Sequence, residues 1–391
     1  MIYADCNATS PMPASVLAQM LPYLTDEFGN PSSVHSRLGA RARDALETAR
    51  GRVSALIGAL PEEIVFLSGG TEASAHALIG AYAANPTKNH IIISAVEHPA
   101  VVEASRFLER VLGARVTSVP VDKNGTLNAE AVYGAIEVDT TIISLMLANN
   151  ETGVVLPVAE AAEIARSRGI VVHTDAVQAA GKMPVRFDEL GVDLMSISAH
   201  KFGGPKGVGA LVVRKGCRWE PVVRGGAQEG GRRGGTQAVA LIAAMGEAAR
   251  LRLEALQNGI EEKMRIQRDR FEREICARTE GVMINGAGAL RLPNTASLRI
   301  DGVIGEELVR VLGERDVFIS AGSACKSGST APSPVLDAMG LSTVESLSTI
   351  RVSFGVETSD EEADNLVDIL TECIAGQRKQ SSAVINTKLL G

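Results

Sequence analysis

Several features that define other classes of protein are missing from this sequence of 391 residues. No apolar stretch reaches the length of about 20 residues that a membrane-spanning helix needs, and the first residues lack the charged and apolar regions of a signal peptide. The formal net charge of −7 gives no basic surface for nucleic acid. We therefore expect a cytoplasmic protein that contacts neither membranes nor nucleic acid directly.

Cysteine and aromatic residues are also scarce. The five cysteines are odd in number and include no C-x-x-C pair, so the sequence indicates neither a disulfide framework nor a metal site. Aromatic residues make up only 3% of the chain, so alanine, valine, leucine and isoleucine have to fill the core. Each cysteine must therefore be judged as a separate thiol.

What the sequence does contain is a series of short apolar, β-branched runs that alternate with helical segments. Buried strands in such an order form parallel sheets that are covered on both faces. The pattern predicts an α/β fold in which a mostly parallel seven-stranded sheet lies between helices. The runs are 64–67, 90–96, 115–121, 140–148, 170–175, 194–199 and 208–213.

The length of the chain favours two domains. A charge-laced helical stretch covers 239–277, and the dipeptide Asn258-Gly259 is expected to divide it. Beyond it, short strands near 295–300 and 349–354 and helices near 305–314 and from about 360 predict a smaller α/β domain. We predict a large domain over 12–255, a small domain over 1–11 and 256–376, and a mobile tail over 377–391.

Two of the buried runs end in polar residues that suit one particular cofactor. The run ending His173-Thr174-Asp175 and the run ending Ser198-Ala199-His200-Lys201 would both reach the carboxyl edge of a parallel sheet. A lysine there can bond covalently to an aldehyde cofactor, and an aspartate can hold a pyridinium nitrogen protonated. Lys201 and Asp175 together predict a site for pyridoxal phosphate, whereas a lone lysine is usually a solvated surface charge.

A possible phosphate site accompanies this pair. The segment Ser68-Gly69-Gly70-Thr71-Glu72 follows the run 64–67 and opens an alanine-rich helix. Glycines allow close approach of the backbone, and a helix start offers unpaired N–H groups to an anion. Taken alone, this Gly-Gly-Thr turn is weak evidence.

The motifs taken together resemble one family. The segments DCNATSP, EFGNPSSVHS, SGGTEAS, AVEHPAV, ANNETGVV, HTDAVQAAGK, SAHKFGGPKGVGAL, GGAQEGGRRGGTQ and SAGSACKSG occur in the order of the NifS/IscS-type cysteine desulfurases, from about residue 2 to 355. These enzymes belong to the class V aminotransferase group of pyridoxal phosphate enzymes. The start of the chain departs from the family pattern at Cys6 and Ser10, and the end does not resemble the segment that housekeeping members use to dock their iron–sulfur scaffold.

The resemblance implies a role for each residue that would surround the cofactor. Lys201 would bond to the cofactor and then shuttle protons, Asp175 would pair with the pyridine nitrogen, and His98 would stack on the ring and relay a proton. A set of polar groups would hold the remaining oxygens of the cofactor: Gly70, Thr71, Ser198 and His200 at the phosphate, and Gln178 and Asn150 at the phenolic oxygen. The sequence alone does not choose between Asn149 and Asn150, although the family register favours Asn150.

The resemblance also implies groups that act on the substrate and across a dimer. Arg351 would clamp the α-carboxylate of L-cysteine, because a guanidinium binds a carboxylate with two parallel hydrogen bonds. Asn150 would also contact the substrate. Thr236, in the segment with Arg233, would reach the cofactor phosphate of the partner subunit, which implies a homodimer.

Cys325 would decide the type of reaction. It lies among small residues, in Ser323-Ala324-Cys325-Lys326-Ser327, as an exposed nucleophile would. The resemblance implies that Cys325 takes the sulfur of L-cysteine as a persulfide, releases L-alanine and passes the sulfur to an acceptor protein for iron–sulfur cluster assembly or nucleic-acid thiolation. A selenocysteine lyase, another class V aminotransferase and a non-catalytic scaffold that binds pyridoxal phosphate are the alternatives.

Overall fold

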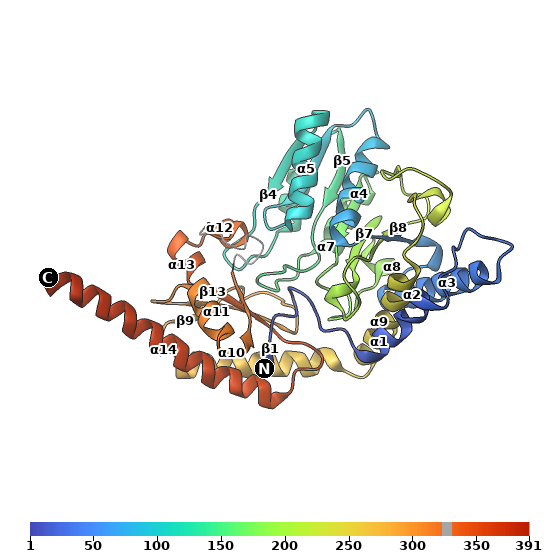
Figure 1. Ribbon diagram of the computed structural model, residues 1–391. Helices are drawn as coiled ribbons and strands as arrows, with labels where there is room; N and C mark the ends of the chain where they lie inside the picture. Colours follow the sequence, from blue (N-terminus) through green and yellow to red (C-terminus); the bar gives the residue numbers. More distant parts are fainter. Residues whose placement is uncertain (323–330, 391) are drawn as a thin grey trace.

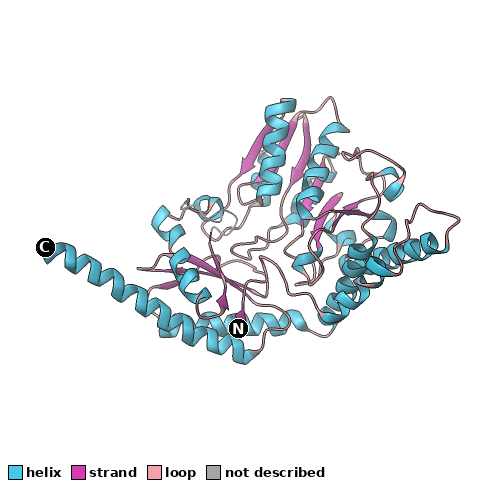
Figure 2. Ribbon diagram, viewed as in Figure 1, coloured by secondary structure: helices cyan, strands magenta, loops and turns pink. Residues whose placement is uncertain are grey.

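The computed structural model describes residues 1–322 and 331–390, with side chains up to residue 380. Its larger part is a sheet flanked by helices, and its smaller part includes the start of the chain and the last helix, which extends beyond it (Figures 1 and 2). Every helix among these described residues is too short or too polar to span a lipid bilayer. Cys325 lies outside the described residues.

The large sheet has seven strands in the order β2-β8-β7-β6-β5-β3-β4. Strand β8 runs antiparallel to both of its neighbours, and the other pairs are parallel. The predicted mostly parallel seven-stranded sheet is thus confirmed. Its strands are β2 (Ile64–Leu67), β3 (His90–Ser94), β4 (Arg115–Val119), β5 (Thr140–Ser144), β6 (Val171–Asp175), β7 (Leu194–Ser198) and β8 (Gly209–Val213).

Successive residues of these strands enter two different cores, one on each face of the sheet. Ile92, for example, packs in a core with helices α3 (Arg37–Ile57), α7 (Val158–Arg166) and α9 (Val239–Gln257). Its neighbour Ile91 packs on the opposite face, against α4 (Gly70–Ala83) and α5 (Pro99–Leu112). Because both faces are covered, apolar residues are required at every position, which is why these strands read as continuous apolar runs.

A second, antiparallel sheet has the strand order β12-β13-β10-β9. Its core also contains Ile2 and Ala4 from the start of the chain, and residues of helices α10, α11 and α14 cover it. The chain start pairs with the same part of the molecule, because β1 is parallel to β11. The elements are β1 (Ile2–Tyr3), β9 (Val282–Ile284), β10 (Thr295–Ile300), β11 (Val317–Phe318), β12 (Ser320–Ala321), β13 (Thr349–Ser353), α10 (Ile260–Arg278), α11 (Gly305–Gly313) and α14 (Asp360–Leu390).

The expected division of the long helical stretch is present. Helix α9 ends at Gln257, Gly259 adopts a left-handed φ of 79°, and α10 begins at Ile260. The shorter helices lie mainly in connections: α1 (Ala14–Met20), α2 (Pro22–Thr25), α6 (Ala129–Gly134), α8 (Phe187–Leu190), α12 (Pro334–Ala338) and α13 (Thr343–Leu347).

The described end of the chain is helical. Helix α14 begins at Asp360 and continues through Leu390, and the mobility of 377–391 stays a prediction. The sequence after Gly376 contains no proline, and its glutamine, arginine, lysine, alanine and leucine residues favour a helix. The helix therefore continues past the small sheet toward the C-terminus (Figure 1).

Candidate functional site

One cavity of about 330 Å³ opens where the parallel strands end, and most of the predicted site residues line it. Asp175 ends β6, Ser198 ends β7, and His98 directly precedes α5. Arg351 enters from β13 of the small sheet. The remaining predicted residues on its wall are Gly70, Thr71, Asn150, Gln178, His200 and Lys201.

Lys201 lies in this wall against the start of the chain. Its Nζ donates hydrogen bonds to the backbone oxygens of Asn7, at 2.6 Å, and Ala8, at 2.9 Å. The neighbouring Ser10 is tied to the same turn, because its hydroxyl donates to the backbone oxygen of Lys201 at 2.9 Å. The chain start thus fixes the position from which the Lys201 amine faces the cavity.

Asp175 forms a buried acid and His98 a half-buried base beside Lys201. Burial raises the pKa of Asp175, while His98 and Lys201 oppose that change by stabilising the carboxylate. Burial lowers the pKa of His98, and Asp175 opposes that shift. The Nδ1 atom of His98 accepts a hydrogen bond from the backbone N–H of Ala100 at 3.1 Å, so the neutral ring carries its proton on Nε2.

The groups predicted to bind phosphate surround the start of α4. This helix begins after Gly69, and no side chain among the described residues caps it. Its free N–H groups therefore share the cavity wall with the hydroxyls of Thr71 and Ser198. Burial and the nearby lysines lower the pKa of His200 to about 4, so this ring is neutral at neutral pH. A Cβ on Gly70 would approach Val177 Cγ2 to 2.8 Å, which explains a glycine there.

The structure separates the roles of two adjacent asparagines. Asn149 Oδ1 accepts from the backbone N–H groups of Glu151 and Thr152, each at 2.9 Å, and its Nδ2 donates to Val96 O at 3.1 Å. Through these hydrogen bonds, the Asn149 side chain shapes the turn after β5. Asn150 lines the cavity instead, which agrees with the choice that the family register favours.

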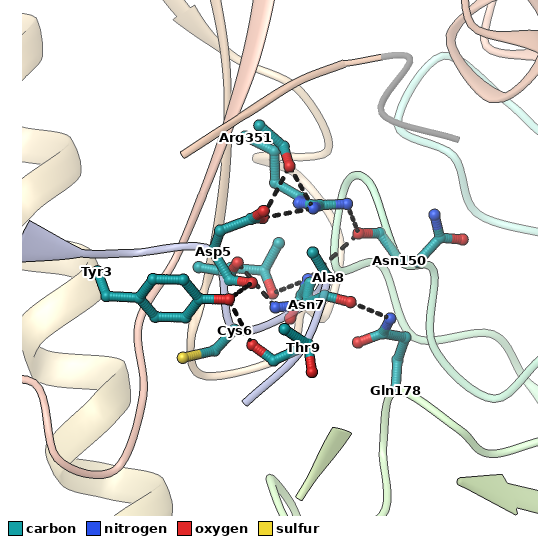
Figure 3. A network of polar contacts seen from close by, with 12 residues as sticks. Tyr3, Asp5, Cys6, Asn7, Ala8, Thr9, Asn150, Gln178 and Arg351 are labelled. Carbon is teal, nitrogen blue, oxygen red and sulfur yellow. Dashed lines mark hydrogen bonds and ion pairs between the residues drawn. The ribbon is translucent and has the colours of Figure 1, made fainter. Parts of the chain in front are cut away.

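Several buried residues at the site had no role in the sequence prediction. Asn7 accepts a bond from Lys182 Nζ at 2.8 Å, and Lys182 also donates to Gln178 Oε1 at 2.6 Å. Burial lowers the pKa of Lys182 well below its usual range. Asn7 and Lys182 both lie in motifs that carried the resemblance, but nothing in their local sequence indicates which distant residues they contact. Figure 3 shows the polar network around Asn7.

Two carboxyl groups near the cavity are also buried. Glu97 Oε1 accepts from Ser94 Oγ at 2.6 Å and from Met146 N at 2.8 Å, and burial raises its pKa to about 8. Glu151 accepts a bond from Ser333, and burial raises its pKa to about 7. Glu97 therefore ties the loop before His98 to the loop that carries Asn150.

Among the predicted site residues that the structure describes, Thr236 is the one that does not line the main cavity. It lines a separate cavity of about 150 Å³ together with Ser68 and Arg233. Arg233 is held there by an ion pair with Glu72, in which Nε lies 3.1 Å from Oε1. Because the predicted role of Thr236 belongs to the site of a partner subunit, its place in one chain leaves that prediction untested.

Comparisons with known proteins agree with this geometry. The family model "Aminotransferase class-V" matches residues 2–366. "Cysteine desulfurase IscS" of Dictyoglomus turgidum is 43% identical over 374 residues, which cover 95% of this chain and 94% of the relative. A solved "NIFS-LIKE PROTEIN" has a TM-score of 0.88 at 33% identity and covers 96% of this chain and 99% of its own. A second, "SspA in complex with cysteine", has a TM-score of 0.79 at 34% identity, with 90% and 99% covered.

The fold and the lysine–aspartate pair define a class V aminotransferase, a class of enzymes that depend on pyridoxal phosphate. Within that class the chain belongs to the cysteine desulfurase family. The cavity suits the cofactor, because uncapped helix N–H groups and two hydroxyls lie at one part of its wall and a buried carboxyl lies at another. Bound there, pyridoxal phosphate withdraws electrons from the bonds at the substrate Cα.

Proposed function

We propose that this chain converts L-cysteine to L-alanine and receives the substrate sulfur as a persulfide on Cys325. The observation that carries this proposal is the meeting of Lys201, Asp175 and His98 with Arg351 in one cavity. The solved relative in complex with cysteine supports the choice of substrate. The arginine comes from a different sheet than the cofactor groups, so the cavity offers a carboxylate site beside the reacting atoms.

Each residue then has a defined task. Asp175 keeps the pyridine nitrogen protonated, and Lys201 holds the cofactor covalently and moves a proton at the substrate Cα. Gly70, Thr71, Ser198 and His200 bind the phosphate, while Gln178 and Asn150 donate to the phenolic oxygen. His98 stacks on the ring, and its Nε2–H acts as a hydrogen-bond donor while Nδ1 accepts from Ala100. Asn150 and Arg351 bind the substrate.

The sulfur transfer itself belongs to Cys325. Its thiolate attacks the substrate sulfur, the Cβ–S bond breaks, and Cβ gains a proton to become the methyl group of alanine. The new S–S bond on Cys325 then carries the outer sulfur to an acceptor protein, for iron–sulfur cluster assembly or nucleic-acid thiolation. This chemistry needs a reduced thiol, which fits a cytoplasmic enzyme.

The proposal extends to assembly. We infer a large domain over 12–255 that holds the cofactor and a small domain over 1–11 and 256–376 that carries Cys325 and Arg351. We further infer a homodimer in which Thr236 reaches the phosphate in the partner's site. Cross-linking or sedimentation of the wild type as a dimer would support the assembly. A lower affinity of Thr236→Ala for pyridoxal phosphate, in a protein that still forms the dimer, would support the role of Thr236.

Alanine and sulfide release from L-cysteine, in the presence of a thiol reductant, tests the reaction. We expect the wild-type enzyme to release both and Cys325→Ser to lose at least about a hundredfold in rate while its cofactor absorbance stays unchanged. Cys276→Ser, which alters an exposed free thiol, is the matched control and should behave as the wild type. Equal rates in Cys325→Ser and the wild type would refute the persulfide, and a wild type that binds the cofactor but yields no alanine would refute the reaction.

A further inference from the structure

The guanidinium of Arg351 is already engaged by groups of the protein. Its Nη2 donates to Asp5 Oδ1 at 2.6 Å and to Ser320 Oγ at 2.8 Å, and its Nη1 donates to the backbone oxygen of Asn150 at 3.0 Å (Figure 3). Only 3% of the residue is exposed. The three acceptors come from the chain start, from β12 and from the turn after β5, so the arginine joins three separate parts of the fold.

The geometry of a guanidinium restricts how a carboxylate binds to it. Two parallel N–H bonds are available from Nε with Nη2, or from Nη1 with Nη2, and both pairs include Nη2. Both hydrogens of Nη2 point at Asp5 and Ser320, whereas the buried Nε has no partner among the described residues. A ligand carboxylate can therefore bind with two bonds only if it takes one Nη2 hydrogen from these acceptors.

Asp5 is held beside Arg351 through both its backbone and its side chain. Its backbone is held beside β13, because Cys6 N donates to Ser353 O at 3.0 Å and Ser353 N donates to Ala4 O at 2.7 Å. Its side chain also accepts a bond from Ser320 Oγ at 2.8 Å. Two carboxylates would thus share one guanidinium in a buried place, and like charges at short range repel each other.

We propose that Asp5 competes with the α-carboxylate of the amino acid for Arg351 Nη2. This inference rests on the proposed role of Arg351 as the substrate carboxylate site. The competition weakens the binding of substrate and of the alanine product alike, so it favours product release. It also selects for a fully charged carboxylate, because an uncharged amide is a weaker acceptor and cannot displace Asp5.

Calorimetric titration of the holoenzyme with 3-mercaptopropionate tests the proposal. This probe has the thiol and carboxylate of cysteine but no amine, so it binds without reacting with the cofactor. We expect Asp5→Asn, which keeps the shape and removes the charge, to bind the probe roughly fivefold or more tightly than the wild type. Ser320→Ala, which removes an uncharged acceptor, should change the affinity by less than about twofold. The exposed Glu314→Gln controls for the loss of a remote charge.

The possible results are distinguishable. If a folded Asp5→Asn enzyme with an unaltered melting temperature binds the acid no more tightly than the wild type, the competition is overturned. Asp5 would then orient Arg351 for the substrate. The uncharged 3-mercaptopropionamide should gain much less affinity from Asp5→Asn than the acid does, because it carries no charge for Asp5 to repel, and a gain equal to that of the acid would also overturn the proposal. If Arg351→Gln binds the acid as well as the wild type, the proposed role of Arg351 fails together with the inference. Failure to form alanine would refute the reaction and leave this comparison intact.

Discussion

The two walls of the cavity are built in different ways. One wall consists of residues that directly end or follow strands of the large sheet, such as Asp175, Ser198 and Lys201. The other includes the chain start, in which Asn7 and Ala8 lie outside the helices and strands and are held by bonds to distant residues. The first wall follows from local sequence and sheet topology, whereas the second exists only because the two sheets meet.

Asn7→Ala is expected to damage the second wall most. Asn7 is 1% exposed, its Nδ2 donates to Thr295 Oγ1 at 2.9 Å, and its Oδ1 accepts from Lys182 at 2.8 Å. Without these atoms, buried polar groups on both sides lose partners, and we expect the free energy of unfolding to fall by about 4 kcal/mol. Urea denaturation measures this. The exposed Asn30→Ala is the control, and a loss for Asn7→Ala no larger than the control's would mean that the chain start contributes little to the site.

Glu97→Gln tests, through the pH dependence of stability, the loop that leads from β3 to His98 in the first wall. Burial raises the pKa of Glu97 from 4.5 to about 8, and its Oε2 has no partner among the described residues. A folded-state pKa above the unfolded value gives stability that is complete below pH 4.5 and is lost as pH rises toward 8.

The wild type should therefore lose about 2 kcal/mol of unfolding free energy between about pH 6 and pH 8 that Glu97→Gln does not lose. Chemical denaturation of both proteins at the two pH values gives the difference. If the unfolding free energies of the wild type and Glu97→Gln changed equally between the two pH values, Glu97 would be ionised in the folded protein at both.

The smallest effect is expected where structure is encoded locally. Ser359 and Glu362 cap the start of α14 reciprocally, with Glu362 N donating to Ser359 Oγ at 3.1 Å and Ser359 N donating to Glu362 Oε2 at 2.8 Å. Ser359→Ala removes one of these bonds and should cost about 1 kcal/mol. Thermal unfolding should show a shift much smaller than that of Asn7→Ala. Equal changes in melting temperature for Ser359→Ala and Asn7→Ala would contradict the expected difference between a local helix cap and contacts that join distant segments.

Much of the fold was open to prediction because its signals are local. Each apolar run of the large sheet is a strand, because burial on both faces requires a continuous apolar run. Asn258-Gly259 separates two helices, because a left-handed turn favours glycine. The helical form of residues 377–390 was not predicted, because a helix with no clear apolar stripe gives no periodic signal in the sequence. Lys182 was missed for a different reason, as its partners lie in other segments.

The α/β class, the family and the residues that end the parallel strands could all be predicted from the sequence. These depend on periodicity and on motifs, which are properties of neighbouring residues. In contrast, the folded chain was needed to show that Asn149 shapes a turn while Asn150 lines the cavity, and that Asp5 holds the guanidinium of Arg351. Asp5 and Arg351 are 346 positions apart, and the folding of the chain start onto β13 brings them into contact.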